Sequence, residues 1–150
     1  MRVLGVDPGI TGAVALVGDG HLAVEDIPTM GDGKRRIINA TGLADIVRRW
    51  SPTLAILERV HAMPKQGVSS SFRFGQSLGP IEGVLATLII SVRYVTPAGW
   101  KRHYRLPADK DAARLAAIQR YPHIADRLAR KKDHNRAEAL LIANWGSEAQ

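Results

Sequence analysis

Three side chains that are common in hydrolytic and metal sites stand close together near the end of the chain: Asp133, His134 and Glu138. Apolar residues recur at helical spacing from Ala137 to Trp145, which predicts a helix with Glu138 at or beside its buried face. A carboxylate there is unfavourable unless a metal ion or a cation neutralises it. His134 precedes Glu138 by one helical turn, and Asp133 is well placed to be the N-cap. The alternative interpretation is an ordinary N-cap followed by a solvated glutamate.

Two further carboxylates follow apolar segments. Residues 2–6 predict a short buried strand that ends at Asp7, and residues 54–57 predict a buried strand of the parallel type that ends at Glu58. Open α/β sheets bind their ligands at the carboxyl ends of the strands. The glycines after Asp7 permit close approach of backbone or phosphate, although Asp-Pro-Gly is also an ordinary turn sequence. Two buried strands are therefore expected to deliver a carboxylate at the same end.

The composition bounds the class of protein. With 150 residues, 45% of them apolar, the chain is expected to form a single domain over residues 1–150. It carries 21 Lys and Arg against 14 Asp and Glu, a formal charge of +7, which together with an acidic site favours an enzyme acting on nucleic acid. A merely basic soluble protein is the alternative. Cysteine is absent, which excludes disulfides, a thiolate nucleophile and cysteine-based zinc sites.

No membrane partner or export signal is expected. No apolar run reaches the length of a membrane span, about 18 residues, and the N-terminus enters a strand without a signal-peptide pattern. The expected location is therefore the cytoplasm.

Strand and helix signals predict an α/β fold. The hairpin signal at Gly18-Asp19-Gly20 joins strands at residues 13–17 and 21–27, and a loop follows over residues 28–34. Helices are expected from Thr41 as N-cap to Trp50, from Ser71 to Leu88 and from Lys110 to Arg120, with an edge strand at residues 93–96. These elements predict a mixed five-stranded sheet, three antiparallel strands and then two parallel ones, with helices on both faces.

Two segments have the composition of binding surfaces. Residues 100–105 interleave cations with aromatic rings, as in surfaces that meet phosphates and stacked bases. Gly75, Gly79 and Gly83 recur every four positions in the helix that begins near Ser71, so that one face can approach a neighbour closely. That face suits burial against the chain's own sheet and self-association equally well. A third segment, Lys34-Arg35-Arg36, has the usual composition of a solvated face.

Taken in order, these segments resemble the RuvC family of Holliday-junction resolvases, with a last motif closest to phage-encoded members. The resemblance is carried by Val6-Asp7-Pro8-Gly9, Ala55-Ile56-Leu57-Glu58, Phe74-Gly75-Gln76-Ser77-Leu78-Gly79, Lys110 and Ala137-Glu138-Ala139-Leu140-Leu141-Ile142-Ala143. It covers nearly the whole chain. It implies a ribonuclease H-like fold, a homodimer, cleavage of four-way DNA junctions with two Mg²⁺ or Mn²⁺ ions, and action in the cytoplasm, that of the host for a phage-encoded protein.

The resemblance also implies roles for individual residues. Asp7 would bridge two ions, Glu58 would bind one and Glu138 with Asp133 the other, since hard cations take oxygen ligands and paired ions suit phosphodiester hydrolysis. His134 would replace Asp133 as ligand or move a proton. The expected DNA contacts are His61, Lys65, Lys101, Arg102 and Lys110, and the expected dimer interface comprises Phe72, Gly75, Gly79 and Gly83.

The sequence departs from the family pattern at two positions. Asn135 stands three positions before the last carboxylate, where the family usually has an acidic residue or histidine, and the last carboxylate is Glu138 where Asp is common. Other functions remain open. They are a ribonuclease H-like nuclease acting on RNA–DNA hybrids or flap DNA, and a non-catalytic junction-binding module. The start of the chain also resembles the phosphate loop of sugar kinases and actin-like ATPases, which are far longer.

Overall fold

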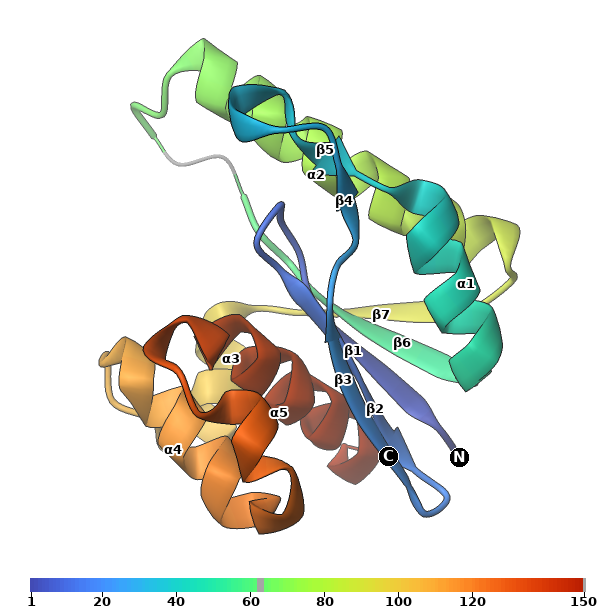
Figure 1. The fold of residues 1–150 in the computed structure, drawn as a ribbon. Helices are drawn as coiled ribbons and strands as arrows, with labels where there is room; N and C mark the ends of the chain where they lie inside the picture. The colour runs from blue at the N-terminus through green and yellow to red at the C-terminus, as the bar shows by residue number, and fades with distance from the viewer. Residues whose placement is uncertain (62–63, 150) are drawn as a thin grey trace.

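A five-stranded mixed sheet forms the centre of the molecule, shown in Figure 1. The computed structural model describes residues 1–61 and 64–149, except for the side chain of Lys110. The strands are β1 (Val3–Asp7), β2 (Ala13–Gly18), β3 (His21–Asp26), β6 (Leu54–Glu58) and β7 (Ser91–Val95), in the order β3-β2-β1-β6-β7. β1, β2 and β3 pair antiparallel, whereas β6 and β7 run parallel to β1. The predicted sheet is confirmed, with β1 in the middle.

Strand alternation divides the side chains of the sheet between two cores. On one face, Leu4 and Val6 of β1 join a core with α1 (Ala40–Trp50) and α2 (Val68–Thr87). On the other face, Val3 of β1 and Ile56 of β6 join a core with α3 (Pro97–His103), α4 (Lys110–Arg120) and α5 (His134–Glu148). Figure 1 shows these two groups of helices on opposite sides of the sheet. Asp7 and Glu58 have the parity of Val3 and Ile56, so both lie on the α5 face.

Glycine lets α5 lie unusually close to β1. A Cβ atom built on Gly5 would be 2.1 Å from the carbonyl oxygen of Ala139 and 2.4 Å from the amide nitrogen of Ala143. A Cβ atom on Gly146 would likewise meet the Ile56 side chain at 2.2 Å. Side chains at these positions would push the helix away from the sheet. The position of α5, and of any group it carries, is therefore fixed against β1 and β6.

Two short 3₁₀ segments lead the chain into α5: η2 (Pro122–Leu128) and η3 (Lys131–Asp133). A two-residue turn at Asp19 and Gly20, with φ of 49° and 74°, closes the β2–β3 hairpin, as predicted. No helix among the described residues is long and apolar enough to cross a membrane.

The structure corrects two sequence predictions. The predicted loop over residues 28–34 contains β4 (Thr29–Met30) and leads through η1 (Gly33–Arg35) to β5 (Ile37–Ile38), which together form a small second sheet. The N-cap of α1 is Asn39, whose side chain accepts a hydrogen bond from the Gly42 amide, and Thr41 lies inside the helix. Asn and Thr are both common N-cap residues, so the sequence offered two candidate caps, and the helix begins after the earlier one.

Candidate active site

Three carboxylates from three separate elements meet at one end of the sheet. Asp7 ends β1, Glu58 ends β6 and Glu138 lies in the second turn of α5. Each offers an oxygen atom within 4.8 Å of the oxygen atoms of the other two. Parallel pairing of β1 with β6 puts the first two side by side, and the close packing of α5 on Gly5 brings the third over them. The structure therefore brings together three of the residues predicted from sequence.

The cluster is unfavourable for three negative charges in the bare protein. Asp7 is 8% exposed and Glu58 is 6% exposed. Burial, followed by the charges of Glu138 and Glu58, raises the pKa of Asp7 well above its usual value. Burial also raises the pKa of Glu58, with the neighbouring Glu138 charge acting in the same direction. Removal from water together with like charges disfavours the ionised forms until a cation enters.

Two residues of α3 line the cluster. The indole N–H of Trp100 donates a 2.8 Å hydrogen bond to Oε1 of Glu58, and this bond partly opposes the rise in the Glu58 pKa. Lys101 places its Nζ 3.3 Å from Oε1 of Glu138, with its side chain half exposed. The prediction that Trp100 belongs to a base-stacking surface is wrong, because its ring is fully buried. The sequence signal that was missed is Pro97, because proline is favoured at the first position of a helix. Residues 97–103 form the helix α3, which begins at this proline.

The donor set fits a hard divalent cation. All three groups are carboxylates, and oxygen is the ligand atom that Mg²⁺ and Mn²⁺ prefer. Among the side chains that the structure describes, Lys101 contacts the cluster, and it supplies one positive charge against three carboxylates. Burial first, and then the charges of Glu138 and Glu58, raise the pKa of Asp7, and Lys101 only partly opposes this rise. These residues therefore form a candidate metal centre.

Asp133 is not brought into this cluster. Its carboxylate is 4% exposed and accepts hydrogen bonds from the Arg130 side chain, at 2.8 Å to Nη2, and from the Arg130 backbone, at 2.9 Å. Arg136 approaches to 3.7 Å and also binds Asp26 of β3. Asp133 occupies the N-cap position of α5, as expected, but makes no side-chain cap bond to that helix. Its hydrogen bonds with Arg130 come first among the causes that lower its pKa.

The neighbouring polar residues of α5 have separate contacts. Nδ1 of His134 lies 3.1 Å from the Lys131 carbonyl oxygen, and Nε2, the other ring nitrogen, takes no part in this contact. His134 is half-buried and does not belong to the carboxylate cluster. The side-chain amide of Asn135 donates a 2.6 Å hydrogen bond to the Thr11 carbonyl oxygen, in the turn between β1 and β2. This contact ties the start of α5 to the loop that follows Asp7.

The predicted DNA contacts differ in exposure. His61, Lys65 and Arg102 are exposed, whereas Lys101 is turned partly inward to Glu138. α4 begins at Lys110, as predicted, and the side chain of Lys110 lies outside the part of the chain that the structure describes. The predicted loop around His61 includes residues 62 and 63, which also lie outside the described residues.

The predicted dimer residues lie on the outer face of α2. A Cβ atom at Gly75, Gly79 or Gly83 would meet nothing within 4 Å, and Phe72 is 70% exposed. The helix instead packs on its own sheet through Ile81, Val84 and Leu85. The interpretation that the glycines allow the helix to sit on the sheet is therefore wrong. The three glycines and Phe72 form an exposed strip on which added side chains would meet open space.

Known proteins with similar sequences or folds match this chain over nearly its whole length. The chain is 29% identical over 160 residues to the crossover junction endodeoxyribonuclease RuvC of Prochlorococcus marinus (strain MIT 9313), covering 97% of this chain and 98% of that protein. The fold is similar to that of Thermus thermophilus RuvC in complex with a Holliday junction substrate, with a TM-score of 0.68, 18% identity, and coverage of 99% and 96%. The fowlpox virus Holliday junction resolvase gives a TM-score of 0.60 at 21% identity, with 99% of each chain covered. No family model matches the chain.

Proposed function

Because the chain is a relative of RuvC over nearly its whole length, we propose that it is a crossover junction endodeoxyribonuclease. It resolves four-way (Holliday) junctions and other branched DNA by paired phosphodiester hydrolysis, and residues 1–150 form one nuclease unit in the cytoplasm. The observation that carries the proposal is the meeting of Asp7, Glu58 and Glu138 at the carboxyl ends of β1 and β6. This position on an open sheet is where such folds keep their sites.

The three carboxylates are proposed to hold two Mg²⁺ or Mn²⁺ ions. Asp7 lies on the central strand and within 4.8 Å of both other carboxylates, so it would be the group shared by the two ions, with Glu58 holding one and Glu138 the other. When bound, such ions activate water and neutralise the charge that develops on the phosphoryl oxygens. Trp100 fixes the Glu58 carboxylate by donating to Oε1, which orients the other oxygen.

Lys101 is proposed to exchange partners when substrate binds. In the structure its ammonium group faces Glu138 at 3.3 Å. A divalent cation on Glu138 supplies the positive charge that Lys101 now provides, which frees the half-exposed ammonium group to pair with a DNA phosphate. This proposal keeps the sequence-based role of Lys101 and gives it a reason for lying beside the carboxylates.

The fourth group of the site is proposed to be His134 or Asp133, and the contacts favour His134. Asp133 would have to leave Arg130 and Arg136 to bind a metal ion. His134 stands one helical turn before Glu138, and a hydrogen bond from Nδ1–H to the Lys131 carbonyl would fix the tautomer with a free, basic Nε2. That nitrogen suits either a metal ion or proton transfer at the departing oxygen.

Paired cutting requires a two-fold dimer, and the outer strip of α2 is its proposed interface. Gly75, Gly79 and Gly83 leave backbone open on an exposed helix face, where each glycine costs about 1 kcal/mol of helix stability relative to alanine. Close contact with a second copy explains their use. Phe72 adds exposed apolar area on this face, and Glu82 lies off it, accepting a hydrogen bond from the Tyr94 hydroxyl.

The dimer is tested by Gly79→Leu. Its side chain has open space within the chain, so the variant should fold and sediment as a monomer that no longer makes paired cuts. Gln119→Leu, on the exposed surface of α4, is the matched control and should remain dimeric. A Gly79→Leu variant that stays dimeric would place the interface elsewhere.

Cleavage of a synthetic four-way junction tests the activity. The protein should cut the junction symmetrically with Mg²⁺ or Mn²⁺ and not in EDTA, and should leave a linear duplex intact. Fork DNA and an RNA–DNA hybrid serve as parallel substrates. Preference for the hybrid would assign a different nuclease function, and binding of the junction without metal-dependent cutting would assign a non-catalytic binding module.

A further inference from the structure

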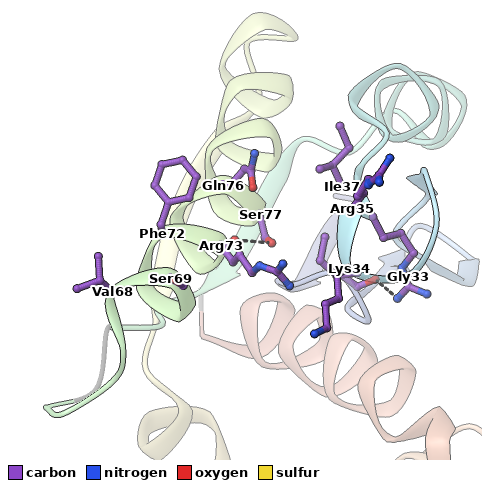
Figure 2. A pocket seen from close by; sticks show the side chains of 12 residues that line it. Gly33, Lys34, Arg35, Ile37, Val68, Ser69, Phe72, Arg73, Gln76 and Ser77 are labelled. Atoms are coloured by element: carbon purple, nitrogen blue, oxygen red, sulfur yellow. Dashed lines mark hydrogen bonds between the residues drawn. The ribbon is translucent and has the colours of Figure 1, made fainter.

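A cationic groove lies beside the proposed active site, between the small β4–β5 sheet and α2 (Figure 2). Its volume is about 870 Å³. Lys34, Arg35 and Arg36 come from the η1 wall, and Arg73 comes from α2. Figure 2 shows Arg73 extending from the helix toward the segment that carries Lys34. The lining contains no carboxylate.

None of these four cations has an acidic partner in the part of the chain that the structure describes. No ion pair of Lys34, Arg35, Arg36 or Arg73 is found among the described residues, whereas Arg49, Arg114, Arg130 and Arg136 each pair with a carboxylate. Asp32 precedes η1 but does not line the groove. The groove therefore keeps a local excess of positive charge, which attracts a polyanion.

The groove opens at the catalytic end of the sheet. Ile10, three residues after Asp7, is part of its lining, and Nη2 of Arg36 donates a 3.3 Å hydrogen bond to the Ile10 carbonyl oxygen. Both walls of the groove start at that end of the sheet. The β4–β5 segment follows β3, which ends at Asp26, and Asp26 lies in register with Ala13 and, one strand further, with Asp7. α2 follows the loop after Glu58. A strand that reaches the carboxylates can continue directly into the groove.

The groove and the proposed dimer strip border each other along α2. Ser69, Arg73 and Gln76 give the groove polar groups from this helix, and Val68 and Phe72 also line it, with side chains that Figure 2 shows pointing away from the η1 wall. The Ser77 hydroxyl already donates to the Arg73 carbonyl oxygen, so Ser69 and Gln76 are the polar groups that remain for a ligand. A polyanion in the groove would therefore lie next to the proposed dimer contact at Phe72, whereas Gly75, Gly79 and Gly83 are not part of the lining.

We propose that this groove binds the phosphate backbone of a substrate DNA strand as it leaves the active site. The inference rests on the proposed function for the identity of the polyanion. Three cations on one wall and one on the other match a chain of regularly spaced phosphates, and the amide and hydroxyl groups add hydrogen bonds to phosphate or sugar oxygens. Contacts of this kind position the DNA relative to the carboxylates without reading its sequence.

The salt dependence of binding tests the groove. Lys34→Ser/Arg35→Ser/Arg73→Ser, made in the Asp7→Asn background to keep the DNA intact, removes three cations and retains the Arg36 contact to Ile10. The slope of log affinity against log salt for a four-way junction should become shallower by about two to three, because each lost phosphate contact removes about 0.9. The thermal midpoint should not change, since these side chains make no ion pairs within the described chain.

The matched control removes the same charge from a surface outside the groove. Arg48→Ser/Arg49→Ser/Arg93→Ser takes three exposed cations from α1 and β7 that do not line the groove, two of which, Arg48 and Arg49, have exposed carboxylate partners. Its slope should stay within about one of the parent protein. Equal slopes for the two triple variants, or no change in the groove variant, would overturn the proposal.

A unique cysteine provides a second, independent measurement. The chain has no cysteine, so Gln76→Cys gives one attachment point in the groove for a thiol-directed photocrosslinker. Crosslinks should form to nucleotides flanking the cut, and Arg93→Cys should give none. Absence of groove crosslinks while the wild-type protein cuts junctions would overturn the groove alone. Groove crosslinks to DNA from a protein that cuts none of the four substrates would support the groove and overturn the nuclease function.

Discussion

Two acidic groups near the start of α5 lie in opposite electrostatic surroundings. Asp133 has Arg130 and Arg136 as partners, and its pKa is lowered from its usual value, chiefly by the Arg130 hydrogen bonds. Asp7 is surrounded by other carboxylates, and burial raises its pKa. The first charge is satisfied by the protein itself, and the second is left for a ligand to satisfy. A buried carboxylate is thus informative about function when its own chain fails to neutralise it.

The largest expected effect is a loss of junction cutting when a charge is removed from the carboxylate cluster of Asp7, Glu58 and Glu138. Asp7→Asn, Glu58→Gln and Glu138→Gln should each reduce junction cutting by roughly 10³-fold or more, because each keeps the shape and removes a metal-binding charge. Junction binding should persist or tighten, since repulsion of phosphates falls. Single-turnover cleavage and gel-shift titration measure the two quantities. Full activity in one variant would remove that residue from the site.

Removing the charge of Asp133, which the protein itself neutralises, should lower the stability of the fold. Asp133→Asn should lower the free energy of unfolding by about 2 kcal/mol, because it weakens charged hydrogen bonds at a buried position. For a chain of 150 residues this corresponds to a fall of about 4–8 °C in Tm. Asp26→Asn is the control, with a smaller effect because the Asp26 side chain is 62% exposed.

His134→Ala provides the opposite signature, a severe loss of cutting with Tm nearly unchanged. At least one of the variants at positions 133 and 134 should be severely defective in cleavage at a temperature where both are folded. A defect confined to Asp133→Asn would make Asp133 the fourth ligand. Normal cutting by both variants would contradict the predicted set of four groups.

Sequence reasoning located the unsatisfied site better than the satisfied one, for a physical reason. A run of apolar residues shows where a buried strand ends, so Asp7 and Glu58 could be placed at the same end of the sheet. The helical spacing of apolar residues placed Glu138 near the core. The contacts of Asp133 depend on a 3₁₀ turn with Arg130 and on Arg136 reaching Asp26, 110 residues away in the chain. Such long-range pairing leaves no periodic signal.

The same limit applies to surfaces. The spacing of Gly75, Gly79 and Gly83 predicts a close contact, but only the packing of α2 on the sheet shows that this face points outward. Lys34, Arg35 and Arg36 have the composition of a solvated run, and the folded β4–β5 segment places them in the same groove as Arg73. Local composition predicts charge, whereas the fold determines what that charge faces.

Trp100→Phe should have an intermediate effect on the unsatisfied site. The change removes the hydrogen bond to Glu58 and keeps a large aromatic ring in the core. The metal concentration for half-maximal cutting should rise about tenfold, as is typical when a group that orients a ligand is lost. Trp145→Phe, on the half-buried side of α5, is the control and should leave the metal dependence unchanged. An unchanged metal dependence in Trp100→Phe would mean that the indole N–H does not orient Glu58.

The smallest expected effect is a difference in how stability depends on pH without divalent metal. The lowered pKa of Asp133 stabilises the fold above the ordinary aspartate pKa of 3.8, and this contribution disappears as pH falls through the lowered value. The contribution of Asp7 to stability depends on pH in the opposite direction, because its pKa is raised in the folded protein. Between 3.8 and its raised folded-state pKa the folded protein binds the extra proton, so stability falls as pH rises through that window.

The metal-free protein should consequently be most stable at mildly acidic pH, and Asp7→Asn should remove part of the decline toward neutral pH, raising Tm there by a few degrees. Mg²⁺ should raise the Tm of the wild-type protein at neutral pH and have little effect on Asp7→Asn, because the ion stabilises the folded state only where it binds. Thermal melts from pH 4 to pH 8 in EDTA, repeated with Mg²⁺, measure both changes. A variant that declines as steeply as the wild-type protein would show that Asp7 is not the unsatisfied charge, since its titration would then contribute nothing to the loss of stability.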